Sequence, residues 1–256
     1  MQGVSHTSGR SLKQPLSYRA FDLGLAAYLP VQALQRRLRA AVADGRTPGA
    51  LLLLEHEPVI TLGSRAGTQD LRGEPLAAED LAADAAHNMQ VLRGIPVAES
   101  ERGGQATLHA PGQLISYPVM PIPGRDLSAY VRGLEEANIL LLAEYGIQAE
   151  RRQGRPGLYV DGDKISSVGL RCQRWVSSHG TSLNVSVDLS LFDSIVSCGE
   201  PHLRQTSIQR LTGLVPDMPD LKQSSLRLVK QVFGWEFEPL SPVCHDRVES
   251  ELGLES

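Results

Sequence analysis

The sequence lacks long apolar runs and has no excess of basic residues. Its longest apolar stretches, residues 50–54 and 139–142, are far shorter than the roughly 18 residues that span a membrane. We therefore expect a soluble protein without a membrane partner. Its 25 basic and 29 acidic side chains give a net charge of -4, which argues against a strongly basic nucleic-acid binder.

Cysteines are few, and histidines are not spaced as metal ligands. Cys172, Cys198 and Cys244 stand far apart with no Cys-x-x-Cys pair, and no two histidines have H-x-x-x-H spacing. This pattern predicts neither a zinc site nor paired-cysteine redox chemistry. We expect no metal, no cofactor, and a reducing cytoplasm as the setting of the protein.

The length and composition fit one large domain or two small ones. Hydrophobic residues make up 41% of the 256 residues and charged residues 21%, as is ordinary for a globular chain. Residues 1–15 are polar and lack the apolar centre of a signal peptide, so we expect a mobile tail. Residues 16–240 are expected to form a single domain and residues 241–256 a polar C-terminal tail, of which residues 249–256 are expected to be frayed.

Hydrophobic periodicity predicts a chain that mixes helices and strands, which is an α+β fold class. The helical spacing is clearest in residues 126–146, and it also occurs in residues 31–42, 76–86, 203–213 and 221–233. Strands are expected at 18–23, 50–55, 59–62, 91–98, 114–119, 157–160, 164–169 and 183–187. The dipeptides Asp161-Gly162 and His179-Gly180 are interpreted as turns between the last three of these strands.

A glycine-rich stretch, residues 102–113, has no amphipathic period. Its paired glycines permit close backbone approach to a ligand, while Arg102 and His109 add a charge and an imidazole. On the glycines alone a tight structural turn is the commoner explanation. The stretch lacks the lysine followed by serine or threonine that a phosphate-binding loop has in that order, so nucleotide binding is not indicated.

Two residues of reactive types, a lysine and a cysteine, lie in the second half of the chain. Cys198 precedes a glycine in a loop, where backbone amides can face a developing negative charge, whereas Cys172 and Cys244 are interpreted as inert. A cysteine nucleophile needs a nearby base or positive charge, and Lys164 is a candidate. Position alone leaves a nucleophilic and an inert Cys198 equally favoured, since 34 residues separate it from Lys164.

Arginines flank this region. An acidic protein partner is one explanation for their excess, and solvated loop arginines are the commoner one. The residues concerned are Arg151, Arg152, Arg155, Arg171 and Arg174.

Five blocks, in order, resemble the lipoyl(octanoyl) transferase family. They are EHEPVITLG at 55–63, RGGQATLHAPGQL at 102–114, KISSVGLR at 164–171, HGTSLNV at 179–185, and Phe192 with Ile195, Cys198 and Gly199. The blocks occur in the family's order across about residues 51–207, an interval that makes up most of the chain.

The resemblance implies a biotin/lipoate protein ligase-like α+β fold with a mixed sheet and helices packed on it. It implies transfer of an octanoyl group from octanoyl-acyl carrier protein to a specific lysine of lipoyl domains. These acceptors are carried by 2-oxoacid dehydrogenase E2 subunits and the glycine cleavage H protein.

The resemblance also implies roles for individual residues, with Cys198 as nucleophile and Lys164 as its partner. It places the acyl and carbonyl groups against Arg102, Gly103, Gly104, Gln105, Ala106, Thr107, Leu108, His109, Ser167, Val168, Gly169, Gly180, Thr181 and Ser182.

The sequence departs from the family at several positions. Ser197 stands where proline is usual, Ala110 where glycine is usual, and Leu108 where tyrosine is common. Thr181-Ser182 replaces a small and apolar pair. These differences concern the shape of the acyl pocket and hence chain length. Two alternatives remain at this point, which are an ATP-dependent lipoate or biotin ligase and a non-catalytic binder of acyl groups or carrier proteins.

Overall fold

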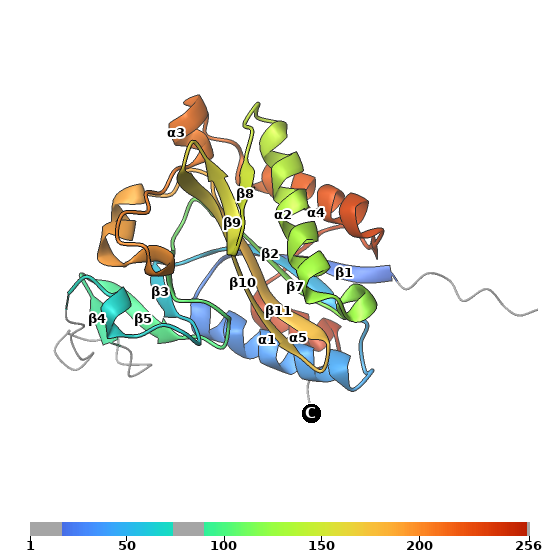
Figure 1. The fold of residues 1–256 in the computed structure, drawn as a ribbon. Coiled ribbons are helices and arrows are strands. Elements are labelled where there is room, and N and C mark those ends of the chain that lie inside the picture. The colour runs from blue at the N-terminus through green and yellow to red at the C-terminus, as the bar shows by residue number, and fades with distance from the viewer. Residues whose placement is uncertain (1–16, 74–89, 255–256) are drawn as a thin grey trace, which may run out of the picture.

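A large mixed sheet forms the centre of the computed structural model, which describes residues 17–73 and 90–254 (Figure 1). Within these residues its strands follow the order β12-β1-β2-β7-β11-β10-β9-β8, and β13 also pairs with β1. Their bounds are Ser17–Ala26 for β1, Ala50–His56 for β2, Gln113–Val119 for β7, Glu150–Arg152 for β8, Arg155–Val160 for β9, Asp163–Gln173 for β10, Val176–Asn184 for β11, Glu236–Phe237 for β12 and Ser241–Pro242 for β13.

A smaller sheet lies beside one end of the large one, in the order β4-β5-β3-β6. Its strands are β3 (Val59–Leu62), β4 (Gln90–Leu92), β5 (Ile95–Glu99) and β6 (Ala106–His109). The short helices η1 (Thr68–Asp70), η4 (Leu189–Ser194) and η5 (Ser197–Gly199) are described on this side of the fold, and η3 (Pro123–Arg125) precedes α2.

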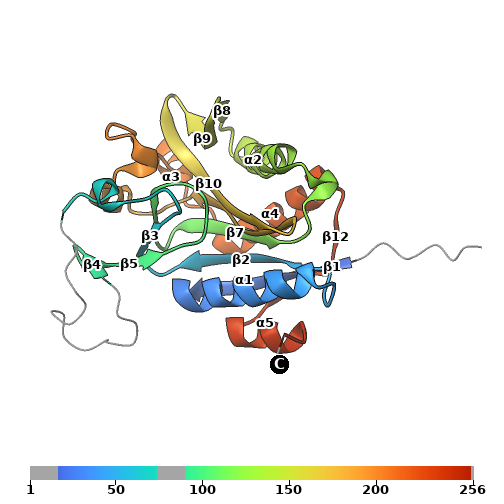
Figure 2. The ribbon, with the colours of Figure 1, turned by 60° about the horizontal axis from the view of Figure 1, so that its bottom comes forward.

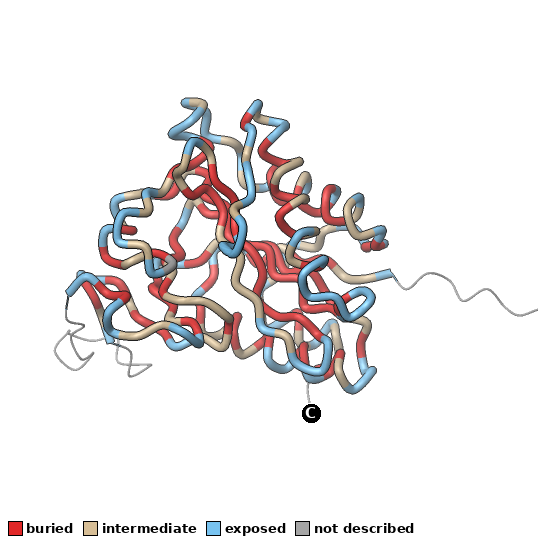
Figure 3. Tube along the Cα trace, viewed as in Figure 1, coloured by how far each residue is buried: buried red, intermediate tan, exposed pale blue. Residues whose placement is uncertain are grey.

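Helices cover both faces of the large sheet (Figure 2). α1 (Tyr28–Ala43) and α5 (His245–Glu251) lie on one face, and α2 (Leu127–Ala143) and α4 (Met218–Phe233) on the other, while α3 (Ile208–Thr212) is a short connecting helix. Because side chains alternate along a strand, β2 sends Leu51 and Leu53 into the α2–α4 core and Leu52 and Leu54 into the α1–α5 core. Both faces of the central strands are therefore buried (Figure 3).

Capping residues fix where the longer helices begin and end. The Asp126 carboxylate accepts the amide of Ala129 at the start of α2, at 2.8 Å. Asp217 caps α4 in the same way, and Gly234 ends that helix in the left-handed conformation. These signals are present in the sequence, so the two helix predictions are confirmed within a few residues.

Three predictions of local structure are wrong. The expected strand 91–98 is a hairpin of β4 and β5, because Arg93 and Gly94 both adopt positive φ. His179-Gly180 is not a turn but lies inside β11, and β10 turns into β11 at Arg174-Trp175. The last expected strand, 183–187, is only the end of β11, which stops at Asn184.

The C-terminal segment is also not a frayed tail. β13 pairs with β1, and α5 buries Val248 completely against the core on the α1 face. Leu254 is buried in the same core. Packed structure therefore continues beyond residue 240. The expected tail 1–15 and helix 76–86 fall outside the described residues.

Candidate active site

A cavity of about 490 Å³ opens where β10 and β11 meet the 102–107 loop and the first turns of α2. Lys164 is part of the cavity lining, which combines polar and apolar side chains. The lining consists of Arg65, Arg102, Gly103, Gly104, Gln105, Ala106, Thr107, His109, Leu127, Val131, Gly154, Arg155, Pro156, Tyr159, Lys164, Ser167, Val168, Gly169, Leu170, Gly180, Thr181, Ser182, Gly199 and Glu200.

The two triplets predicted from the resemblance are cross-strand partners in this lining. Ser167 pairs with Ser182, Val168 with Thr181, and Gly169 with Gly180 in the antiparallel β10–β11 ladder. Gly180 allows β11 to approach β7 closely, because a Cβ added there would lie 2.0 Å from the carbonyl oxygen of Ser116.

Leu108 is the one predicted binding residue that does not line the cavity. It is fully buried in the core of the small sheet, with Ile60 and Val97. Alternation along β6 explains the difference, since Thr107 and His109 on either side belong to the cavity lining. Leu108 therefore belongs to the core of the small sheet and not to the cavity lining.

Lys164 is buried at the beginning of β10, with 2% of its surface exposed. Its amine donates to the carbonyl oxygen of Pro156 at 3.3 Å and lies 5.5 Å from the centre of the Tyr159 ring. The backbone of Lys164 also makes two hydrogen bonds to the segment that follows Cys198. The N–H of Lys164 donates to Arg204 O, and its carbonyl oxygen accepts from Thr206 N, each at 2.9 Å.

The backbone of residue 198 belongs to η5, whereas the side chain of Cys198 lies outside the described part of the structure. Gly199 and Glu200, which follow it directly, line the same cavity as Lys164. Gly199 packs so closely on Gln105 that an added Cβ would meet its side-chain amide at 2.2 Å. The 34-residue interval thus returns the cysteine-bearing segment to the cavity that contains the lysine.

Arg102 holds the glycine loop against β3. Its guanidinium donates to the hydroxyl and carbonyl oxygens of Thr61 at 2.6–3.1 Å and to Gly103 O at 3.2 Å. Gly103 in turn donates its amide to Leu170 O of β10 at 2.8 Å. A buried positive charge is thereby fixed at the cavity wall.

A chain of buried amides connects His109 to the backbone of Lys164. Gln113 donates from its amide nitrogen to Asn184 Oδ1 at 2.8 Å, so its oxygen faces His109 Nδ1, which must donate. Asn184 then donates to Thr206 O, and Thr206 N donates to Lys164 O. Burial, together with His56 and Arg102, lowers the pKa of His109 well below its usual value. This histidine is therefore a neutral donor and acceptor at pH 7.

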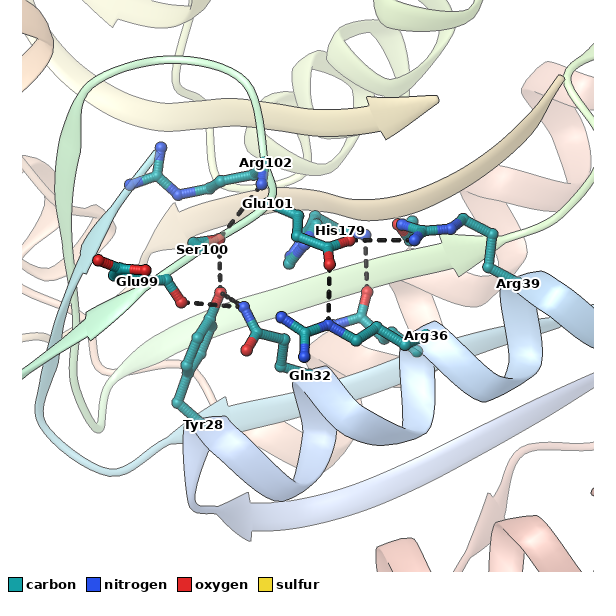
Figure 4. Close-up of polar contacts among 11 residues, drawn as sticks. Tyr28, Gln32, Arg36, Arg39, Glu99, Ser100, Glu101, Arg102 and His179 are labelled. Carbon is teal, nitrogen blue, oxygen red and sulfur yellow. Dashed lines mark hydrogen bonds and ion pairs between the residues drawn. The ribbon is translucent and has the colours of Figure 1, made fainter. Parts of the chain in front are cut away.

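Polar contacts connect α1 to residues 99–102, where the glycine loop begins (Figure 4). The Tyr28 hydroxyl donates to Ser100 at 2.7 Å, and Gln32 donates to the carbonyl of Glu99. Glu101 pairs with Arg36 and Arg39. Burial alone would raise the pKa of Glu101, but the bonds from these arginines leave it below its usual value.

His179 stands in β11 with φ of +58°, a conformation that costs energy for a non-glycine residue. Its amide donates to Gln35 Oε1 of α1 at 2.6 Å, which fixes the strand just before Gly180. Burial, followed by the charges of Arg102 and Arg39, lowers the pKa of His179 to about 3. The buried imidazole is therefore neutral at pH 7.

Comparison with known proteins decides the family. The Lipoyl protein ligase A/B catalytic domain matches residues 27–230. An octanoyltransferase of Nitratidesulfovibrio vulgaris is 41% identical over 216 residues, which is 83% of this chain and 93% of that protein. One from Geobacter metallireducens is 40% identical over 205 residues, covering 79% and 87%. This chain belongs to the octanoyltransferase family. It is accordingly an acyltransferase, and the predicted resemblance is confirmed.

Solved structures confirm the fold prediction as well. A putative lipoate protein ligase from T. acidophilum with bound lipoic acid superposes with a TM-score of 0.65 at 13% identity, covering 93% of this chain and 94% of that one. A lipoate-protein ligase A bound with ATP gives 0.64 at 13% identity, with the same coverage. At such identities the likeness shows the fold alone.

Sequence reasoning missed several members of the cavity lining of this octanoyltransferase. Leu127 and Val131 carry the helical spacing of a core face, yet they line the cavity from the first turns of α2. Arg65, Pro156 and Tyr159 had no signal of their own. Pro156 and Tyr159 reach the cavity because β9 pairs with β10, and Arg65 because its amide bonds to Gly104 O of the glycine loop.

The flanking arginines are largely engaged within the chain. Arg151 pairs with Glu135 and Glu136, Arg152 stacks 4.3 Å above the Tyr159 ring, and Arg174 bonds to Asp44. Contacts within the chain therefore engage three of the five flanking arginines, and docking of an acidic partner at this region stays a prediction. Among the described residues no helix is long and apolar enough to cross a membrane, and no group of three His, Cys, Asp or Glu side chains is placed to hold a metal ion.

Proposed function

We propose that this octanoyltransferase transfers an octanoyl group from octanoyl-acyl carrier protein to a specific lysine of lipoyl domains, through a thioester on Cys198. One observation carries the proposal: the buried Lys164 lines the same cavity as Gly199 and Glu200, which directly follow Cys198. The family membership supplies the octanoyl group as the transferred unit. E2 subunits of 2-oxoacid dehydrogenases and the glycine cleavage H protein are the proposed acceptors.

The first step forms an acyl-enzyme. The Cys198 thiolate attacks the carbonyl carbon of the donor thioester, the C–S bond to the carrier breaks, and the carrier leaves as a thiol after taking a proton. Lys164, as an ammonium, favours the thiolate and can supply that proton. The octanoyl group is then held on Cys198 as a new thioester.

The second step forms a stable amide. The neutral amine of the acceptor lysine attacks the Cys198 thioester, a proton leaves the attacking nitrogen, and the Cys198 thiolate is released. Lys164, now neutral after the first step, is placed to accept that proton. Since the donor already carries an activated acyl group, the proposed reaction requires no nucleotide.

The lining residues divide into polar and apolar parts that suit this reaction. We assign the carbonyl end of the donor to the loop that contains Gly103 and Gly104, where backbone can approach closely. The apolar chain is assigned to Leu127, Val131 and Val168. The neutral His109 is assigned to hydrogen bonding with bound substrate.

Intact-protein mass spectrometry tests the covalent step. Incubation with octanoyl-acyl carrier protein, without acceptor, should add one octanoyl mass, and peptide mapping should place it on the peptide that contains Cys198. Cys172→Ser and Cys244→Ser serve as controls that keep the adduct, while Cys198→Ser should lose it. If product forms without any adduct on the wild-type enzyme, the covalent mechanism is wrong. If transfer requires ATP and free octanoate, the enzyme is a ligase instead.

A further inference from the structure

The Lys164 amine rests on a peptide unit that is held from its other side by a buried carboxylate. The carbonyl of Pro156 accepts from Lys164 Nζ at 3.3 Å. The N–H of the same peptide unit, on Gly157, donates to Glu135 Oε1 at 2.9 Å. Because the peptide is trans, its carbonyl and N–H point in opposite directions, so one group faces the cavity and the other faces α2.

Glu135 is built into the fold rather than exposed at its surface. It lies on the face of α2 that packs against β9, and 5% of its surface is exposed. Its second oxygen accepts from Arg151 Nε at 3.1 Å, which compensates the buried negative charge. A carboxylate bonded to an amide N–H also polarises the attached carbonyl, which strengthens the bond that this carbonyl accepts.

Gly157 provides the space that the amine occupies. Its φ of +123° is a conformation that glycine adopts and residues with a side chain avoid. A Cβ at this position would lie 2.8 Å from Lys164 Cε, 3.1 Å from Lys164 Nζ and 2.4 Å from Ser166 O. A β-bulge between Lys164 and Ser166 accompanies this close approach of β9 and β10.

We propose that Glu135 is a positioning residue that fixes the Lys164 amine through the Pro156–Gly157 peptide unit. The carboxylate sets the orientation of the peptide, and the peptide carbonyl sets where the amine points in the cavity. One part of this inference rests on the proposed function, namely the role of Lys164 in acyl transfer. The geometric connection stands on the contacts of Glu135, Gly157 and Lys164 themselves.

Adjacent glutamates provide a matched control for this proposal. Glu135 and Glu136 both pair with Arg151, but only Glu135 holds the amide of Gly157. Glu135→Leu should therefore disturb Lys164, while Glu136→Leu should not. Glu135→Gln keeps an oxygen in place to accept from Gly157 and should preserve most of the wild-type behaviour.

Lysine-selective ¹³C labelling reads the position of the amine without relying on activity. The chain has four lysines, Lys13, Lys164, Lys222 and Lys230, so the ε-methylene signals can be assigned with Lys→Arg variants. Glu135→Leu should shift the Lys164 signal and leave that of the buried Lys222 in place. An unmoved Lys164 signal in a folded Glu135→Leu protein would overturn the proposal, and so would equal shifts in Glu135→Leu and Glu135→Gln.

Kinetics then connect the position of the amine to the reaction. Misplacing a catalytic group lowers kcat, so Glu135→Leu should reduce kcat by about 10- to 100-fold with little change in KM. If Lys164→Ala turns over normally while Glu135→Leu still moves the Lys164 signal, the proposed role of Lys164 is wrong and the positioning contact is right. A wild-type kcat in Glu135→Leu, with Lys164→Ala impaired, overturns the positioning role.

Discussion

Gly169 of β10 and Gly180 of β11 are paired directly across the sheet, at the point where the ladder forms a wall of the cavity. The two glycines come from separate sequence blocks, and each admits a close neighbour. Gly169 lies against the Arg102 side chain and Gly180 against the backbone of Ser116. The wall is thus held between the glycine loop on one side and β7 on the other.

We predict that Gly180→Ala destabilises the protein by about 1–3 kcal/mol, the usual cost of an extra methyl group in a packed interior. The new Cβ would stand 2.0 Å from Ser116 O and 2.9 Å from Pro118 Cδ, so β7 and β11 must move apart. Urea unfolding measures the change. Gly103→Ala should cost less, since its Cβ comes no closer than 3.3 Å to Leu170 O. Equal costs for the two substitutions would contradict the prediction.

We predict that Lys164→Ala slows acyl transfer by about 10²- to 10⁴-fold, the range expected for loss of a proton-transfer group, while the fold survives. Lys164→Met, which fills much of the same buried space without an amine, should be equally slow. Steady-state kinetics and circular dichroism provide the measurements. Lys222→Met is the control, because Lys222 is also buried but pairs with Asp22 away from the cavity. Normal turnover of Lys164→Ala would refute the assigned role.

Local sequence signals predicted the parts of the fold that local physics determines. The Asp126 cap and the spacing of Leu134, Leu141 and Leu142 define α2, and these leucines are buried as expected. Tertiary packing prevails elsewhere. His179-Gly180 has the composition of a turn, but contacts with Gln35 and Ser116 hold both residues in the middle of a strand.

The family blocks identified most of the cavity wall, although the sequence does not show how far apart in space the blocks lie. Residues 102–107 and the β10–β11 triplets all reach the cavity because sheet register brings them together. Leu108 lies outside the lining because strand alternation turns its side chain into the small-sheet core. The sequence could not assign Leu127 and Val131 to the cavity, because an apolar residue on a helix gives the same pattern whether it faces a core or a cavity.

Acid should destabilise the fold through its buried neutral histidines. Burial lowers the pKa of His56 to about 4, while the bond from its ring to Ala26 O partly opposes the shift. Between the unfolded pKa of about 6.5 and about 4, the unfolded chain binds a proton that the folded chain does not. Stability is thus complete above about pH 6.5 and is lost as pH falls toward 4, by up to about 1.4 kcal/mol per pH unit for this residue.

Urea unfolding between about pH 7 and pH 5 measures this slope. His56→Gln removes one titrating group and should reduce the slope, while Gln can still donate a hydrogen bond. His245→Gln is the control, because His245 lies at the start of α5 and pairs with the exposed Asp246. A slope that does not change in His56→Gln would show that another group accounts for acid destabilisation.

The arginines of the cavity lining should affect the carrier-linked donor, and one of them, Arg155, also belongs to the flanking set and pairs with Glu200. Arg65 and Arg155 both line the cavity and are exposed. We predict that Arg65→Gln and Arg155→Gln raise KM for octanoyl-acyl carrier protein several-fold, and more at low salt, where exposed charges are less screened. A small octanoyl thioester should show little change. Arg125→Gln, an exposed arginine outside the cavity lining, is the control, and an equal effect from it would contradict the prediction.

The first turns of α2 should influence which acyl chain length is used. Leu127 and Val131 supply apolar wall to the cavity, so a larger side chain at Val131 shortens the space available to a chain. We predict that Val131→Phe lowers kcat/KM for octanoyl relative to hexanoyl thioesters by about 10-fold or more, since each methylene in an apolar pocket is worth roughly 1–3 kcal/mol.

Direct competition between hexanoyl and octanoyl donors, followed by mass spectrometry of the acylated acceptor, measures this ratio. Leu140→Phe is the matched control, because Leu140 is partly buried on the same helix but packs against the core instead of lining the cavity. It should leave the ratio near that of the wild-type enzyme even if it lowers stability. A ratio that stays unchanged in Val131→Phe would place the acyl chain along another wall, with the β10 residues Val168 and Leu170 as the next positions to enlarge.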